Sequence, residues 1–181
     1  PSASDQGTCA TPLALTQGHD DLVGGDFGED LREGLPGVPL RLLLRVRDRA
    51  CRPLQGARVD LWHTDALGRY SGVNAPGTFC RGWQATDERG EVAFLTLFPG
   101  WYPSRTPHLH LRVEAGGRVF ATQLFFPEEV QRQVYALPPY RERGMPRVNN
   151  RQDGLFRADL LLRLEREGEA YRGAFVLTLP G

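Results

Sequence analysis

The sequence contains no lysine, so all 22 of its basic residues are arginines. Acidic residues are equally numerous, and the formal net charge is zero. A chain without net positive charge has little electrostatic attraction for nucleic acid or for an anionic membrane surface. No stretch approaches the roughly 20 apolar residues of a membrane-spanning helix. We therefore expect neither nucleic acid nor a membrane as a partner.

Cysteine and methionine are also scarce. None of the three cysteines belongs to a C-x-x-C pair, which argues against a thiolate zinc site. In an exported protein, a disulfide between Cys9 and Cys51 would leave Cys80 free. The chain starts at Pro1 and its only methionine is Met145, so we expect that the initiating end is missing, either because a signal peptide is removed or because the sequence is a piece of a longer one. We expect export to the periplasm or the cell exterior; the alternative is a cytoplasmic protein with reduced cysteines.

The length of 181 residues suits one ordinary domain. Residues 1–37 are rich in Gly, Asp, Ser and Pro without a sustained period, which predicts a wrapping segment ahead of a domain over 38–181. From Leu40 to Val46, leucine and valine alternate with arginine, as in a strand with one solvent-facing side. Pro127 and the glutamates after it predict a short helix over 127–135. Further strands are predicted over 57–63, 92–98, 108–114, 119–126, 156–164 and 171–179. The fold class is therefore all-β: an antiparallel sandwich of about eight short strands with long loops and one short helix.

His108 and His110 stand two residues apart in one predicted strand. Residues i and i+2 of a strand project from the same face, so the two imidazoles lie side by side. Such a pair is half of a four-ligand metal site. Ordinary polar sheet faces also carry such pairs, and the spacing alone favours that simpler interpretation.

Two tyrosines are candidates to complete the site. Tyr102 precedes His108 by six residues, and Pro103 and Pro107 stiffen the connection between them. Tyr70 follows a glycine turn after the strand at 57–63. Two phenolates and two imidazoles suit a ferric ion better than zinc or copper. The alternative is that both are ordinary sandwich tyrosines with buried rings and exposed hydroxyl groups, and the residues by themselves leave this open.

Three blocks of sequence resemble the intradiol ring-cleavage dioxygenases, the family of catechol 1,2-dioxygenases and protocatechuate 3,4-dioxygenases. The blocks are V-D-L-W-H-T-D-A-L-G-R-Y-S at 59–71, G-W-Q-A-T-D-E-R-G-E-V-A-F at 82–94, and F-P-G-W-Y-P-S-R-T-P-H-L-H at 98–110. The short single domain is most similar to the family's exported branch. The resemblance implies an iron(III) enzyme that cleaves a catechol-type ring between its two hydroxyl-bearing carbons with O2, giving a muconate-type diacid.

The resemblance also implies residue roles. Tyr70, Tyr102, His108 and His110 would bind one Fe3+ per chain, and Tyr102 would leave the ion when substrate binds. Arg105 would stabilise negative charge developing on the substrate, and Gln123 would lie near it. His63 matches no ligand of the family, so we expect a hydrogen-bonded structural histidine, and we expect His19 to be exposed.

Near the C-terminus, Arg143, Gly144, Asn150 and Asp153 resemble an R-G…N-x-x-D pattern of the exported branch, and we expect no catalytic role for them. Two other functions remain open. One is a non-catalytic β-sandwich module that binds aromatic or lignin-like ligands. The other is a zinc hydrolase built on the histidine pair, for which a third nitrogen or carboxylate ligand is not evident. The sequence predicts neither the particular catechol nor the oligomeric state.

Overall fold

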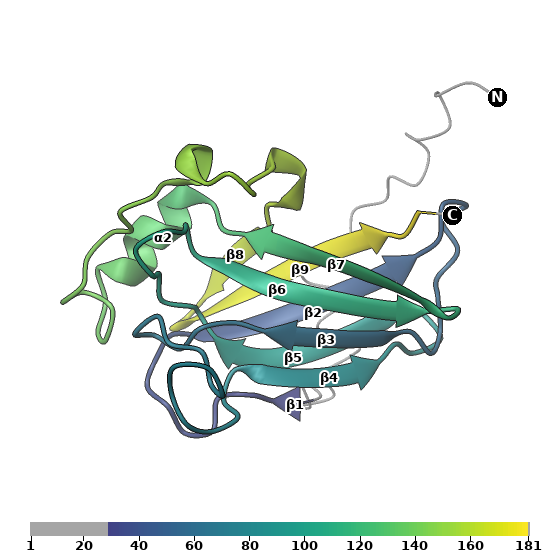
Figure 1. Ribbon diagram of the computed structural model, residues 1–181, viewed down its shortest axis with the longest axis horizontal. Helices are drawn as coiled ribbons and strands as arrows, with labels where there is room; N and C mark the ends of the chain where they lie inside the picture. Colours follow the sequence, from purple (N-terminus) through teal and green to yellow (C-terminus); the bar gives the residue numbers. More distant parts are fainter. Residues whose placement is uncertain (1–28, 181) are drawn as a thin grey trace.

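The computed structural model describes residues 29–180, which form a sandwich of two sheets (Figure 1). The five-stranded sheet has the order β1-β5-β2-β9-β8, and the four-stranded sheet has the order β4-β3-β6-β7. The first sheet comprises β1 (Glu29–Asp30), β2 (Pro39–Arg47), β5 (Glu91–Leu97), β8 (Arg163–Glu167) and β9 (Ala170–Thr178). The second comprises β3 (Arg58–Trp62), β4 (Arg81–Ala85), β6 (His108–Ala115) and β7 (Arg118–Phe125). The predicted all-β sandwich is confirmed.

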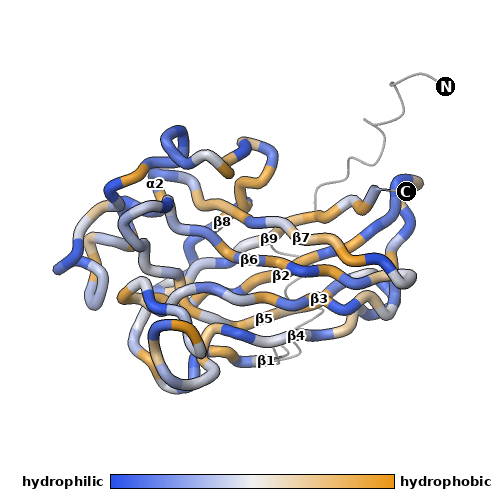
Figure 2. The backbone as a smooth tube through the Cα atoms, viewed as in Figure 1, coloured by the Kyte–Doolittle hydropathy of each residue, from blue (hydrophilic) through white to orange (hydrophobic). Residues whose placement is uncertain are grey.

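Alternation along the strands explains which faces meet. In β2, Leu40, Leu42, Leu44 and Val46 are fully buried, whereas the arginines between them are partly exposed. The same alternation of apolar and polar residues runs through much of both sheets (Figure 2). Most strand pairs are antiparallel, but β2 pairs with β9 and β1 with β5 in parallel. The apolar faces of the two sheets enclose one main core.

The helix α2 (Glu128–Tyr135) begins after Pro127 and carries two glutamates in its first turn. Negative side chains there stabilise the N-terminal end of a helix through its dipole. The helix lies at the end of the sandwich where the long segment after it also gathers (Figure 1). Tyr135 and Tyr140 pack around the ring of Phe98 and donate hydrogen bonds to the carbonyl oxygens of Pro99 and Phe98. The C-terminal third of the chain therefore fixes the loop that precedes β6.

The prediction of a strand over 156–164 is wrong. Residues Ala158–Leu160 form the 3-10 helix η3, and β8 starts only at Arg163. Before that point Leu162 donates its backbone hydrogen to the Phe125 carbonyl oxygen in the other sheet. The segment crosses between the sheets and therefore cannot pair along β9. The other predicted strands and the helix agree with the structure to within two residues at each end.

Cys51 is disulfide-bonded, and Cys80 is a free thiol buried in the sandwich. Cys9, the expected partner of Cys51, lies outside the described residues, as do His19 and most of the predicted wrapping segment. The structure describes the wrapping segment from residue 29 onward, and there Glu29 and Asp30 pair with β5. Between residues 29 and 180, no helix is both long and apolar enough to cross a membrane.

Candidate metal centre

The two histidines of β6 project from the outer face of the four-stranded sheet. Leu109 and Leu111 point the other way and are fully buried in the core. In the register, His110 lies opposite Trp62 of β3 and Gln123 of β7. The indole ring of Trp62 stacks on the imidazole of His110 with 5.0 Å between centroids and 5° between planes. The same-face prediction for His108 and His110 is therefore correct.

Tyr70 reaches the histidines from the loop after β3. The carboxylate of Asp65 accepts hydrogen bonds from the backbone of Leu67 and Arg69 and pairs with the Arg69 side chain, which closes a tight turn around Gly68. Gly68 adopts a positive φ of 79°, a conformation that glycine adopts without strain. The turn directs Tyr70 back toward the sheet.

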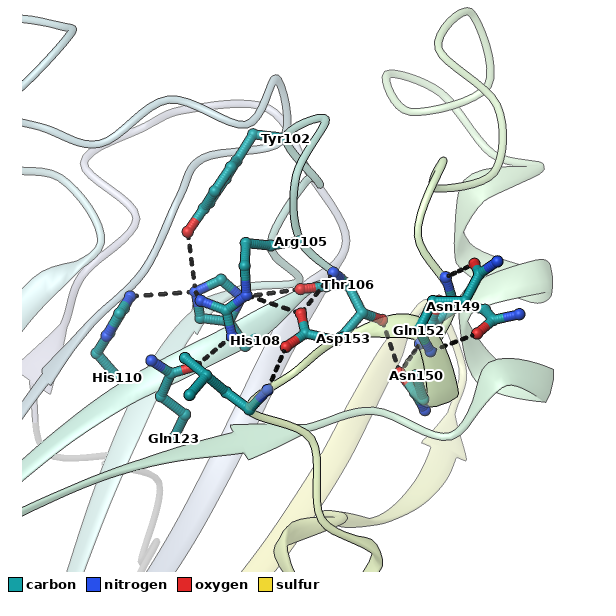
Figure 3. Close-up of polar contacts among 12 residues, drawn as sticks. Tyr102, Arg105, Thr106, His108, His110, Gln123, Asn149, Asn150, Gln152 and Asp153 are labelled. Atoms are coloured by element: carbon teal, nitrogen blue, oxygen red, sulfur yellow. Dashed lines mark hydrogen bonds and ion pairs between the residues drawn. The ribbon is translucent and has the colours of Figure 1, made fainter.

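Tyr102 lies in a second tight turn, just before β6. The Arg105 backbone donates to the Tyr102 carbonyl oxygen at 3.1 Å, with Pro103 at the second position of the turn, where its fixed φ is favourable. Tyr102 and Arg105 therefore leave the loop together and approach His108 from one side. Figure 3 shows both side chains converging on this histidine.

Four side-chain atoms meet at the centre of this region. The Tyr70 hydroxyl oxygen lies 2.9 Å from His110 Nε2, 3.2 Å from His108 Nε2 and 3.3 Å from the Tyr102 hydroxyl oxygen. His108 Nε2 lies 3.2 Å from the Tyr102 hydroxyl and 3.1 Å from His110 Nε2. The structure thus brings together all four residues predicted as ligands; their binding of a metal stays a prediction.

The four groups do not carry enough protons to form a hydrogen bond at each of their five contacts. His108 Nδ1 lies 2.8 Å from the Thr106 carbonyl oxygen, so it carries the proton and leaves the Nε2 lone pair facing the centre. Burial lowers the pKa of both His108 and His110 to about 4, so both imidazoles are neutral near pH 7. Two phenols and one imidazole supply at most three protons for five contacts. A cation bound by all four atoms removes the mismatch.

The spacing of the four atoms also fits a metal ion. Ligands bonded at about 2.0–2.2 Å to one ion lie roughly 3 Å from one another, and the five contacts here measure 2.9–3.3 Å. Among residues 29–180, His, Cys, Asp and Glu side chains form no group of three that could hold an ion. The cluster therefore depends on its two phenols.

Arg105 and Gln123 lie beside the cluster. Arg105 Nη1 is 3.5 Å from His108 Nε2, and Arg105 Nη2 donates to the Gln123 side-chain oxygen at 2.6 Å. Arg105 Nε donates to Asp153 Oδ2 at 2.7 Å. Although burial opposes ionisation, hydrogen bonds from Arg105, Leu155 and Thr106 hold the pKa of the Asp153 carboxyl below its ordinary value.

Asn150 and Asp153 are the contributions to this region that the sequence did not predict. The Thr106 hydroxyl donates to the Asn150 side-chain oxygen at 2.6 Å, and the Thr106 backbone donates to Asp153 at 3.0 Å. Both acceptors lie at the 3-10 helix η2 (Asn150–Gln152), more than forty residues further along the chain. In the sequence, only the N-x-x-D spacing pointed to Asn150 and Asp153. That spacing did not indicate which residues they contact.

His63 stands apart from the cluster, as predicted. It is buried between the Thr64 carbonyl oxygen and the Thr96 hydroxyl, each 2.7 Å from a ring nitrogen. Desolvation lowers the pKa of His63 to about 4. It is therefore a neutral structural histidine.

Comparisons with known proteins agree with this architecture. A family model described as "Dioxygenase" matches residues 19–134. The chain is 30% identical over 136 residues to the protocatechuate 3,4-dioxygenase beta chain of Burkholderia cepacia, covering 63% of this chain and 57% of that one. It is 29% identical over 128 residues to a chlorocatechol 1,2-dioxygenase of Rhodococcus opacus, covering 58% and 50%. The chain thus spans about half the length of these curated relatives.

Solved structures give closer matches in length. An intradiol ring-cleavage dioxygenase from Tetranychus urticae is 32% identical, with a TM-score of 0.78, covering 84% of this chain and 85% of that one. The dioxygenase domain of a dioxygenase carbohydrate-binding protein fusion from Streptomyces sp. SirexAA-E is 36% identical, with a TM-score of 0.67, covering 83% and 86%. The sequence blocks, the sandwich and these matches agree. The chain belongs to the intradiol ring-cleavage dioxygenase family.

Proposed function

We propose that this protein is an iron(III) enzyme that cleaves a catechol-type ring between its two hydroxyl-bearing carbons with O2. Both oxygen atoms enter the product, a muconate-type diacid. The observation that carries the proposal is the convergence of two phenols and two imidazoles through five contacts of 2.9–3.3 Å. Their donor set, two hard anionic oxygens and two neutral nitrogens, suits a hard trivalent cation.

Burial explains why such a cation is needed. Desolvation raises the pKa of the Tyr70 phenol above its ordinary value, so forming its phenolate near pH 7 requires a cation that compensates the charge. A trivalent ion would offset that cost and hold the phenolate form of Tyr70 and Tyr102. Bound Fe3+ would supply a centre that withdraws electron density from a chelated diol and makes the ring reactive toward O2.

The chain's own residues would bind and orient the substrate. Tyr102 is partly exposed at the start of its turn, so its phenolate is suited to accept a proton from the incoming diol and to move away. Arg105 faces the same side of the cluster with Nη1. A guanidinium at that place stabilises negative charge that develops on the ring. Gln123 lies next to His110 on the sheet and holds Nη2 of Arg105.

The experiment that tests this function is product analysis with the iron-loaded protein. Catechol and a chlorinated and a carboxylated derivative would each be incubated with the protein under 18O2. The proposal predicts a ring-opened diacid that carries two labelled atoms from at least one of them. Aromatic binding without oxygen consumption would instead indicate the non-catalytic module.

We also propose that the protein is exported from the reducing cytoplasm, because Cys51 is disulfide-bonded and such bonds persist mainly in oxidising compartments. Fractionation of the source cells, with thiol labelling of Cys51, tests this. Recovery in the cytoplasm with Cys51 reduced would contradict it.

A further inference from the structure

The Asp153 carboxylate serves two different partners with its two oxygens. Oδ1 accepts a hydrogen bond from the Leu155 backbone at 2.9 Å, within its own segment. Oδ2 accepts from Arg105 Nε at 2.7 Å and from the Thr106 backbone at 3.0 Å. The Asp153 side chain is fully inaccessible to solvent, and that of Arg105 is 17% exposed. The pair is therefore shielded from water and salt, unlike a surface ion pair.

These contacts fix how the guanidinium of Arg105 is oriented. Asp153 holds Nε and Gln123 holds Nη2, so the remaining nitrogen, Nη1, is directed toward His108 (Figure 3). A planar guanidinium has its donors in a fixed fork, so anchoring two of its nitrogens sets the position of the third. Without Asp153, Gln123 alone would hold the group, and rotation about that single contact would be allowed.

The same carboxylate oxygen also reaches a candidate ligand. It holds the backbone N–H of Thr106, and the Thr106 carbonyl oxygen accepts from His108 Nδ1 at 2.8 Å. Outer groups of this kind orient a ligand's ring and fix its tautomer. One oxygen of Asp153 therefore touches both the arginine and the backbone that orients His108.

A purely structural role in the turn would not require Oδ2. The 3-10 helix η2 has its own cap, because Asn149 and Gln152 exchange two side-chain-to-backbone hydrogen bonds of 2.9 Å. The oxygen of Asp153 that serves its own segment is Oδ1. Oδ2 contributes to the turn containing Arg105 and not to its own turn.

We infer that Asp153 is a positioning residue, which fixes the Arg105 guanidinium against the cluster of Tyr70, Tyr102, His108 and His110. The inference rests on the proposed function. Asp153 lies beyond residues 19–134, the part that the family model matches. The segment after α2 is thus part of the catalytic apparatus and does more than cover it.

The first test compares Asp153→Asn with Asn149→Ala in the iron-loaded protein. The asparagine has nearly the same shape, but it loses the charge and cannot accept all three hydrogen bonds. Loss of an outer partner of this kind typically costs 10- to 100-fold, so we expect kcat to fall by roughly that factor while iron content and the visible absorption band are retained. Asn149→Ala removes the cap of the same turn without touching Arg105, and kcat should change less than about 2-fold.

The second test is a double-mutant cycle with Arg105→Gln, which should lower kcat by roughly 100- to 1000-fold. If Asp153 acts through Arg105, adding Asp153→Asn to Arg105→Gln changes kcat little further. Equal losses from both control and test variants, or losses that multiply in the double variant, would overturn the inference.

Melting temperatures complete the cycle and do not depend on activity. Arg105→Gln leaves a buried carboxylate without its cation and should lower the melting temperature by about 10 °C. The double variant should recover much of that loss, because neither charge remains. A double variant that melts no higher than Arg105→Gln would overturn the inference. If Arg105→Gln does not fold, a double variant that also fails to fold would overturn it. If the wild-type protein were inactive and colourless, the proposed function would fail, while this stability coupling would still decide whether Asp153 holds Arg105.

Discussion

The backbone of Gly100 lies directly against the carbonyl group of Ala66. A β-carbon on Gly100 would come within 2.2 Å of the Ala66 carbonyl oxygen and 2.8 Å of the Gly68 backbone nitrogen. The Gly100 N–H donates to the Asp65 carbonyl oxygen at 2.8 Å, and its own carbonyl oxygen accepts from the Thr64 hydroxyl at 2.6 Å. The loop that carries Tyr70 and the loop that carries Tyr102 are therefore locked together, backbone against backbone.

This contact leads to the first prediction. Gly100→Ala should separate the two loops, lower the free energy of unfolding by about 3 kcal/mol or more, and weaken iron binding because Tyr70 and Tyr102 no longer meet. Chemical denaturation and iron titration measure the two effects. Gly154→Ala is the matched control, since a β-carbon there meets nothing within 4 Å. Equal behaviour of the two variants would contradict the account.

The second prediction concerns the two tyrosines. Tyr70→Phe removes a phenolate that, in the proposed site, stays on the metal, so the visible band should weaken or shift both with and without catechol. In Tyr102→Phe the resting band should change, but the band with anaerobic catechol should match that of the wild type, because Tyr102 leaves on substrate binding.

Tyr171→Phe is the control for the tyrosine variants, because this buried phenol contacts Gln133, on the helix α2. Its spectrum should equal that of the wild type. An unchanged spectrum in Tyr70→Phe would remove Tyr70 from the metal site.

The sequence predicted the parts of this site that follow from local geometry. His108 and His110 share a face because strand side chains alternate, and Pro103 and Pro107 indicated a stiff connection between Tyr102 and His108. The meeting of Tyr70 with Tyr102 could not be derived from periodicity, because it depends on two loops that lock through Gly100. It was predicted only through the resemblance to the family.

The pairing of Asp153 with Arg105 could not be predicted from the sequence. Asp153 follows a 3-10 turn in a segment without hydrophobic period, and its partner Arg105 is 48 residues away. Long-range pairing of polar residues leaves no periodic pattern in a single sequence. The parallel pairing of β2 with β9 was missed for a similar reason, since alternation predicts a strand but not its neighbour.

The third prediction follows from the buried His63 and His108 and the half-buried His110. In the protein without iron, the pKa of His63, His108 and His110 is about 4, against 6.5 in an unfolded chain. Between these values the unfolded chain binds more protons than the folded one, so stability is fully present above pH 6.5 and is lost as the pH falls toward 4. At pH 5, His63 alone should cost about 2 kcal/mol relative to pH 7.

Urea denaturation of the iron-free protein at pH 5, 7 and 8 tests this prediction. The histidine contribution to the free energy of unfolding should be nearly equal at pH 7 and pH 8. It should be clearly smaller at pH 5. Iron loading should not flatten this dependence, because a metal that holds His108 and His110 neutral in the folded protein leaves the proton uptake of the unfolded chain unchanged. Equal stability of the iron-free protein at pH 5 and pH 7 would contradict the burial of these histidines.

The most direct test of the central claim is the visible spectrum of the purified protein, recorded with its iron content and after anaerobic addition of catechol. We expect one iron per chain, a red to burgundy colour from tyrosinate-to-iron charge transfer, and a shift of that band when catechol binds. A protein that stays colourless after iron loading, or that binds zinc and gives no band, would contradict the account.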